Sequence, residues 1–153
     1  MENNLIIKKA NLEDIDKIID IENDLNNRIL SDVVLKNELN DNNYFYLIAY
    51  LDNLPIGYLS FSLCVEHADL NSIVIKKNYR QKNFAYQFLN FAIKELENLR
   101  IEKIFLEVRK SNVPAIKLYE KLSFTVINTR KNYYSSPDED ALIYIKEINS
   151  PHN

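Results

Sequence analysis

The pattern of apolar and polar positions predicts strands and helices that follow one another from residue 5 to about residue 148. Where strands are expected, apolar residues alternate with polar ones or form short runs. Where helices are expected, apolar residues recur three or four positions apart. The expected strands are 5–9, 45–51, 56–65, 70–76, 103–109, 124–129 and 141–147, and the expected helices are 12–22, 32–39, 83–99 and 114–122.

Local signals support several of these boundaries. Asn11 and Asp14 have the spacing of a capping box at a helix start. Pro114 falls in the first turn of a helix, where its missing N–H costs little. The resulting order of elements predicts an α/β (α+β) protein with a mixed sheet and helices on both faces. That order does not identify a function by itself.

Length and composition exclude several classes of protein. The 153 residues predict a single domain over 1–150 and a short polar tail over 151–153. The apolar run 47–51 is too short to cross a membrane, and the N-terminus lacks a signal-type apolar region. A net charge of −3 argues against a nucleic-acid partner. One cysteine excludes an internal disulfide, so we expect a cytoplasmic protein.

One segment has the features of an anion site. Residues 79–86 join an expected strand to the longest expected helix, and they include Arg80 and Lys82. Free backbone N–H groups and the helix dipole favour a phosphate at such a position. The ordinary alternative is a solvated strand-to-helix turn.

Three single side chains are further candidates, each with an ordinary alternative. Glu107 lies in a strand whose alternate residues are apolar, where an exposed carboxylate is common. Asn112 stands where it caps the following helix. Tyr119 lies on an apolar helix face, where a tyrosine is more often part of the core.

Taken together, these stretches resemble the GNAT superfamily of N-acetyltransferases. Residues 80–85, RQKNFA, are similar to its acetyl-CoA motif Q/R-x-x-G-x-G/A. Residues 106–115, LEVRKSNVPA, with Leu118-Tyr119 and Ser123-Phe124, resemble the motif L-E-V-R-x-S-N-x-x-A…L-Y…x-G-F. That motif is typical of the RimI subfamily, the ribosomal-protein-alanine N-acetyltransferases. Residues 130–134, RKNYY, resemble the ending of the same subfamily.

The resemblance implies two central strands that splay apart, with acetyl-CoA between them and no metal. It implies Glu107 as the general base and Tyr119 as the general acid for the departing thiolate. The acceptor implied is the N-terminal amine, alanine by resemblance, of a small-subunit ribosomal protein. The positions implied to bind acetyl-CoA are Ile73, Val74, Ile75, Gln81, Lys82, Asn83, Phe84, Ala85, Tyr86 and Asn112.

The departures from the family pattern leave alternatives open. Asn83, Ala85 and Ser123 replace usual glycines, in a chain whose only glycine is Gly57. Asparagine tolerates a positive φ better than other non-glycine residues, so we expect a working loop. The segment 24–31 lacks the subfamily's aromatic-Pro-Trp stretch, which helps form the acceptor groove. Another protein N-terminus, a small amine, or a non-catalytic acyl-CoA-binding module are therefore alternatives, and the oligomeric state stays open.

Cys64 is a weak candidate for a covalent intermediate. No base motif lies nearby in the sequence, and His67 follows three positions later. Within one strand that spacing places the two side chains on opposite faces. We therefore expect the acceptor amine to attack the thioester directly.

Overall fold

The structure, a computed structural model, describes residues 5–149 and has the expected order of elements. Its strands are β1 (Ile6–Lys9), β2 (Tyr44–Leu51), β3 (Leu54–Cys64), β4 (His67–Ile75), β5 (Lys103–Arg109), β6 (Thr125–Tyr134) and β7 (Glu139–Glu147). Its α-helices are α1 (Ile15–Asn23), α2 (Asp32–Leu39), α3 (Phe84–Asn98) and α4 (Val113–Lys121), and its 3₁₀ turns are η1 (Leu12–Asp14) and η2 (Lys77–Tyr79).

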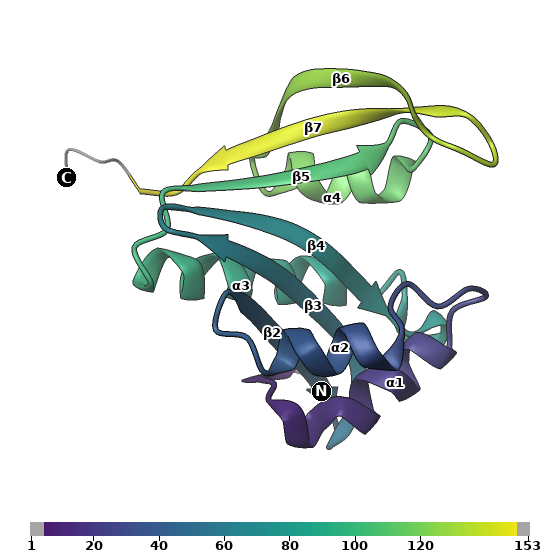
Figure 1. The fold of residues 1–153 in the computed structure, drawn as a ribbon, viewed down its shortest axis with the longest axis vertical. Helices are drawn as coiled ribbons and strands as arrows, with labels where there is room; N and C mark the ends of the chain where they lie inside the picture. The colour runs from purple at the N-terminus through teal and green to yellow at the C-terminus, as the bar shows by residue number, and fades with distance from the viewer. Residues whose placement is uncertain (1–4, 150–153) are drawn as a thin grey trace.

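The strands form one seven-stranded mixed sheet in the order β1-β2-β3-β4-β5-β7-β6. Neighbouring strands are antiparallel except β4 and β5, which run parallel. That parallel pairing extends only from His67 opposite Lys103 to Asp69 opposite Phe105. Beyond this point the two strands diverge, as Figure 1 shows. The expected splay of the central strands is therefore present.

Helices cover both faces of the sheet (Figure 1). α1 and α2 pack on one face, over a core cluster that includes Tyr46, Ile48 and Tyr58. α3 and α4 lie on the other face, over a larger cluster that includes Phe88 and Leu106. The alternation of side chains along each strand sends neighbouring residues into different clusters. Strand periodicity thus determines which polar residues are left facing the splay.

The largest difference from the expected elements is the length of β6, which continues to Tyr134 rather than ending at 129. β6 is an edge strand whose residues are exposed almost throughout. An edge strand without a buried face has no apolar alternation for the sequence to reveal. β4 also begins at His67 rather than at 70, because its first residues pair with both β3 and β5.

Turn and cap chemistry otherwise follows the sequence. The capping box is confirmed, because Asn11 N–H donates to Asp14 Oδ2 at 3.0 Å and Glu13 N–H donates to Asn11 Oδ1 at 2.9 Å. The residues that follow it form the 3₁₀ turn η1 before α1 begins. Asp52 and Asn53 both have positive φ and connect β2 directly to β3, as a type I′ hairpin requires.

A buried carboxylate fixes α1 and the segment after it. Glu22 is fully buried on α1, at the apolar spacing of that helix. One of its oxygens accepts the Tyr58 hydroxyl hydrogen from β3, and the other accepts Ile29 N–H at 2.7 Å. A buried charge is tolerated only when it is hydrogen-bonded, and here both oxygens are. Glu22 therefore ties the 24–31 segment to the sheet.

We predict that Glu22→Ala lowers the free energy of unfolding by about 3 kcal/mol, because the buried Tyr58 hydroxyl and the partly buried Ile29 N–H lose their acceptor. Urea unfolding followed by circular dichroism measures this change. The control is Asp20→Ala, which removes an exposed carboxylate from the same helix and its ion pair with Lys76. That change should cost less than about 0.5 kcal/mol. Equal costs for the two variants would contradict the role given to Glu22.

Candidate active site

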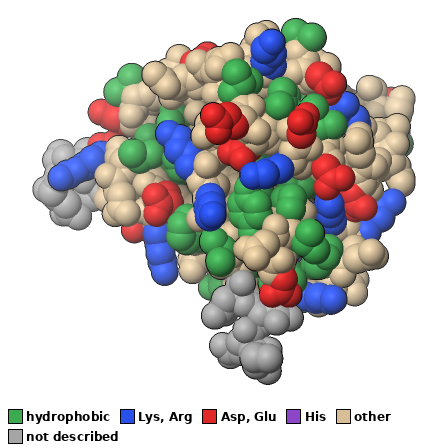
Figure 2. Space-filling model, turned by 90° about the horizontal axis from the view of Figure 1, so that it is seen from below, with side chains coloured by type: hydrophobic (Ala, Val, Ile, Leu, Met, Phe, Trp, Pro, Cys, Tyr) green, Lys and Arg blue, Asp and Glu red, His purple; other side chains and the backbone are tan. Residues whose placement is uncertain are grey.

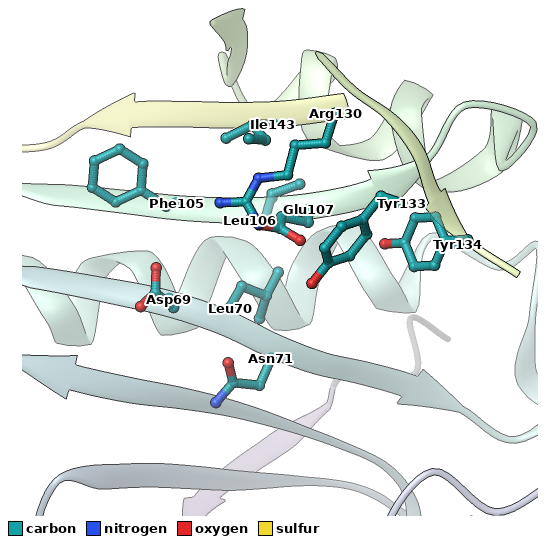
Figure 3. Close-up of a pocket in the computed structure, with 10 residues that line it drawn as sticks. All are labelled: Asp69, Leu70, Asn71, Phe105, Leu106, Glu107, Arg130, Tyr133, Tyr134 and Ile143. Carbon is teal, nitrogen blue, oxygen red and sulfur yellow. The ribbon is translucent and has the colours of Figure 1, made fainter. Parts of the chain in front are cut away.

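A cavity of about 610 Å³ opens where β4 and β5 separate. Figure 3 shows its lining side chains converging from β4, β5, β6 and β7. The residues that line it are Asp69, Leu70, Asn71, Phe105, Leu106, Glu107, Arg130, Tyr133, Tyr134 and Ile143. Residues of four strands thus meet at one place, because the parallel pairing of β4 and β5 ends early.

Glu107 is the carboxylate of β5 that faces this cavity. Its side chain is 31% exposed, and its Oε1 lies 3.3 Å from a guanidinium nitrogen of Arg130 on β6. The flanking Leu106 and Val108 are buried in the core on the α3 and α4 side. The exposed strand face predicted for Glu107 is therefore correct, and that face is the wall of the cavity rather than open surface.

Two consecutive tyrosines on β6 form another wall of the cavity. The rings of Tyr133 and Tyr134 meet edge to face, with centroids 5.1 Å apart. The Arg109 guanidinium lies 4.4 Å from the centre of the Tyr134 ring, and that of Arg130 lies 5.3 Å from the Tyr133 ring. Burial raises the pKa of Tyr134, and the negative charge of Glu107 raises it further.

Tyr119 is held by the C-terminal cap of α4. Its carbonyl accepts Phe124 N–H at 3.0 Å, and Ser123 N–H donates to the Glu120 carbonyl at 3.0 Å. Ser123 has φ 69, so this is a Schellman motif with serine in the usual glycine position. The apolar contact of that motif is between the rings of Tyr119 and Phe124, 5.9 Å apart.

Tyr119 is 7% exposed and is not among the residues that line the cavity. Its ring also packs against Tyr144 of β7. Burial raises the pKa of Tyr119 to about 12, and the nearby Tyr134 adds to that increase. The structure therefore places Glu107 at the cavity and Tyr119 in the core cluster beside it, near Tyr134.

The candidate anion loop has the backbone conformation expected of it. Asn83 is the N-cap of α3 with φ 68 and ψ 10, in the left-handed region, and Gln81 also has a positive φ. Lys82 is exposed, whereas Ala85 and Tyr86 are half-buried in the first turn of the helix. The prediction that asparagine takes over a glycine conformation at position 83 is confirmed.

Arg80 has a structural contact that the sequence did not predict. Its Nε donates to the Ile75 carbonyl at 2.8 Å, which closes the loop against the end of β4. A carbonyl has two lone pairs, so Ile75 keeps capacity for another donor. Ile73, Val74 and Ile75 pair with β3 on one side, and the β4–β5 pairing has already ended on the other.

Gly57 is required where β3 passes this segment. A Cβ atom at position 57 would lie 2.6 Å from the Val74 carbonyl oxygen and 2.7 Å from Ile75 Cδ1. The only glycine of the chain thus stands at a close backbone approach, next to the strand that borders the splay.

Asn112 has an ordinary structural role, and Cys64 lies in a β-hairpin. Asn112 caps α4, because its Oδ1 accepts Ala115 N–H at 3.3 Å. Cys64 and His67 lie on different strands, opposite each other in the β3–β4 hairpin. The expectation that they occupy opposite faces of one strand was wrong, because the chain turns between them. The His67 ring instead packs edge to face against Phe105, with centroids 5.5 Å apart.

Sequence reasoning missed the polar residues of β4 that face the cavity, Asp69 and Asn71. The alternation of buried Ala68 and Leu70 with exposed neighbours carried the signal. The predicted strand began at 70, which left Asp69 in a turn. Burial raises the pKa of Asp69, the positive charge of His67 lowers it, and the charge of Glu107 raises it, with a net increase.

The 24–31 segment is fixed beside the loop but does not line the cavity. Asp24 Oδ2 accepts Lys77 N–H at 2.7 Å, and Asn26 Oδ1 accepts from Lys77 Nζ at 3.1 Å. The expected contribution of 24–31 to an acceptor groove is therefore not seen in the residues that line the cavity.

Three further observations concern membranes, metal ions and surface charge. Within residues 5–149, no helix is long and apolar enough to cross a membrane. The same residues contain no group of three or more His, Cys, Asp or Glu side chains arranged to hold a metal ion. Figure 2 shows acidic and basic side chains interspersed on the face seen there, rather than gathered into one basic stripe.

Known proteins with similar sequences and structures identify the family. The acetyltransferase (GNAT) family matches residues 12–124. A Bacillus subtilis protein described as a candidate ribosomal protein bS18-alanine N-acetyltransferase is 31% identical over 150 residues, which cover 97% of this chain and 99% of that protein. An N-alpha-acetyltransferase of Saccharolobus solfataricus is also 31% identical, over 93% of this chain and 92% of that protein.

A solved structure supports the same assignment. The crystal structure of the ribosomal-protein-S18-alanine N-acetyltransferase from Escherichia coli matches with a TM-score of 0.88 at 26% identity, over 96% of each chain. The family match spans most of the sequence, and the single domain with a mixed seven-stranded sheet agrees with it. The chain therefore belongs to the acetyltransferase (GNAT) family and is an N-acetyltransferase.

Proposed function

We propose that this enzyme transfers the acetyl group of acetyl-CoA to the N-terminal amine of a ribosomal protein, with alanine as the first acceptor residue. The observation that carries the proposal is Glu107, on the wall of a cavity that opens where β4 and β5 separate. The relatives whose names specify an acceptor act on a ribosomal protein alanine. Such an acceptor places the reaction in the cytoplasm.

In this proposal acetyl-CoA lies in the splay as the donor substrate. Its pyrophosphate rests on the loop 81–86, where the left-handed Asn83 turns backbone N–H groups outward at the start of α3. Its pantetheine arm follows Ile73, Val74 and Ile75, on the side of β4 that has no strand partner there. Asn112 donates its side-chain NH₂ group to the pantetheine arm, since its Oδ1 already accepts a hydrogen bond at the start of α4.

The acceptor amine attacks the thioester carbonyl carbon directly. A C–N bond forms, the C–S bond breaks, and CoA leaves as a thiolate. An α-amino group has a pKa of about 7.7–8.0, so a single carboxylate suffices to take its proton. Glu107 accepts that proton through a water, which shares the carboxylate with Arg130. A backbone N–H near Val74 donates to the developing oxyanion.

Tyr119 acts on the departing sulfur. A phenol whose pKa is raised to about 12 stays protonated at the pH of the reaction. A thiol has a reference pKa of about 8.5, so the phenol helps most as a hydrogen-bond donor to the sulfur in the transition state. This refines the general-acid role expected from the sequence.

A second acceptor class has specific support. The archaeal relative is described as an N-alpha-acetyltransferase without a ribosomal acceptor, and it is as similar to this chain as the bacterial relative is. The 24–31 segment also departs from the pattern of the alanine-specific subfamily. Another protein N-terminus is therefore the alternative acceptor.

A panel of peptides tests the acceptor and the base together. We predict that peptides beginning with alanine are acetylated faster than those beginning with serine, glycine or methionine, and faster than small amines. Mass spectrometry of the products measures this.

Glu107→Gln should lower turnover about 100-fold at pH 7 and less at pH 9, where the amine is already neutral.

Three outcomes would contradict these assignments. A preference for another N-terminal residue favours the alternative acceptor, and acetylation of small amines alone removes the protein acceptor. Parental turnover of Glu107→Gln at pH 7, with a verified acceptor, removes Glu107 as the base.

For Tyr119→Phe we predict a turnover about 100-fold lower with nearly unchanged acetyl-CoA affinity, because the phenol acts on the leaving group. The folded pKa lies above the reference value of 10.0, so the phenol keeps its proton as pH rises to about 12. Parental turnover should therefore show no alkaline fall from this residue between pH 7 and 10. Rates across a pH series and isothermal titration measure both effects.

The matched control is Tyr144→Phe, which removes the same atom from the ring that packs against Tyr119. It should keep turnover within about threefold, since its hydroxyl donates to Glu120 at 3.2 Å on the α4 side. Equal losses in the two variants would make Tyr119 a packing residue.

Asn83 tests the phosphate loop. We predict that Asn83→Gly keeps or improves acetyl-CoA affinity, because glycine adopts φ 68 without a Cβ penalty. Asn83→Val should weaken binding, because a β-branched residue resists the left-handed region by about 1–2 kcal/mol. Isothermal titration with acetyl-CoA measures both variants.

Asn53→Val is the control for backbone strain alone. Asn53 has φ 67 in the β2–β3 turn, away from the loop, so its valine variant should lose stability without losing acetyl-CoA affinity. If Asn83→Val binds acetyl-CoA as well as the parent does, the loop does not hold the pyrophosphate.

A further inference from the structure

Arg109 at the end of β5 makes contacts that the reaction itself does not use. One of its terminal nitrogens lies 3.2 Å from Glu139 Oε2 and donates to the Pro137 carbonyl at 3.3 Å. The other donates to the Ser135 carbonyl at 3.3 Å. Its guanidinium plane also covers the Tyr134 ring at 4.4 Å. One side chain therefore holds the end of β6, the turn 135–138 and the start of β7.

Glu139 extends this connection to α4. Its Oε1 accepts Ser111 N–H at 2.5 Å, in the turn that leads from β5 into that helix. Hydrogen bonds from Ser111 and the charge of Arg109 hold the pKa of Glu139 below its ordinary value. The carboxylate is thus shared between β5, β7 and the turn before α4.

Arg109 lies next to the cavity, and its contacts involve a residue of the cavity wall. Arg109 lies two residues after Glu107, so both side chains project from the same face of β5. Tyr134, which Arg109 covers, lines the cavity beside Tyr133 (Figure 3). β6 is an edge strand paired only with β7, and its register is irregular between Arg130 and Tyr134. Sheet pairing alone therefore fixes this tyrosine wall poorly.

We propose that Arg109 is a positioning residue for the acceptor: it holds Tyr134 and the turn 135–138 against the cavity, and so determines how tightly the acceptor binds. This inference rests on the proposed function, because it assigns the cavity to the acceptor. It separates acceptor binding, which depends on the tyrosine wall, from acetyl-CoA binding, which depends on β4 and the α3 loop.

The geometry requires arginine rather than any cation. A planar guanidinium donates in several directions at once and stacks on an aromatic ring, whereas an ammonium does neither in the same way. An isolated ion pair at this exposure contributes little, but here the ion pair, two carbonyls and a ring are engaged together. Lysine at position 109 keeps the positive charge but loses the two separate terminal nitrogens that donate to different acceptors.

Steady-state kinetics of the full chain test the proposal, with acetyl-CoA and an alanine-starting peptide varied in turn. Arg109→Gln should raise the KM for the peptide about tenfold, as expected for lost hydrogen bonds to a charged group. Its kcat and its KM for acetyl-CoA should change less than about twofold, because the missing contacts do not act on the thioester. Arg109→Lys should fall between the parent and Arg109→Gln.

Hydrogen exchange gives a readout that does not need an acceptor. In Arg109→Gln the amides of 133–140 should exchange faster than in the parent, while those of β2 and β3 stay unchanged. Glu139→Gln, which keeps the shape and removes the charge, provides a second variant if Arg109→Gln does not fold. Arg100→Lys is the matched control, since Arg100 is exposed in the turn before the start of β5, away from the 135–138 turn.

The outcomes separate this inference from the proposed function. A parent that acetylates no N-terminal peptide contradicts the proposed function, and hydrogen exchange then still decides whether Arg109 holds 133–140. An active parent with an unchanged peptide KM in all Arg109 and Glu139 variants overturns the inference. Parallel losses in kcat and in both KM values overturn it too, because they indicate a general structural role.

Discussion

The fold depends on the early end of the parallel pairing between β4 and β5. Only three residue pairs join the two halves of the sheet, β1 to β4 on one side and β5 to β7 on the other. Parallel strands normally continue side by side, since their backbone groups need partners. Separation here leaves part of β4 without a strand neighbour and opens the cavity. The geometry of the candidate site follows from that gap, because Glu107 and the tyrosine wall border it from the β5 half.

Each half of the sheet stabilises the segments on its own side of the gap. On the β4 half, the fully buried Glu22 anchors the 24–31 segment, and Gly57 allows β3 to pass close to Val74. On the β5 half, the Schellman motif at the end of α4 holds Tyr119, and the guanidinium of Arg109 packs on Tyr134. These are local devices of backbone geometry and buried polar bonding, and together they position side chains that come from distant parts of the sequence.

Local and periodic features were predictable from residue type and spacing, whereas the splay of the central strands was expected only from the family resemblance. The α1 capping box, the α3 loop and the exposed face of Glu107 follow from spacing and residue type. The position of Asp69 at the cavity and the full length of β6 do not. The first requires the register of β4 against β5, which is a long-range property. The second concerns an edge strand without a buried face, so its residues carry no alternation.

The near absence of glycine also changes the unfolded protein. Nine described residues other than glycine hold a positive φ, among them Asn83, Arg100 and Ser123, and the single glycine is kept for a close contact. A chain with side chains at nearly every position samples fewer backbone states when denatured, so it loses less entropy on folding. The same substitutions strain the native turns. A glycine-rich chain would have relaxed turns but would lose more conformational entropy on folding. This protein instead has strained native turns and a denatured state with fewer backbone conformations.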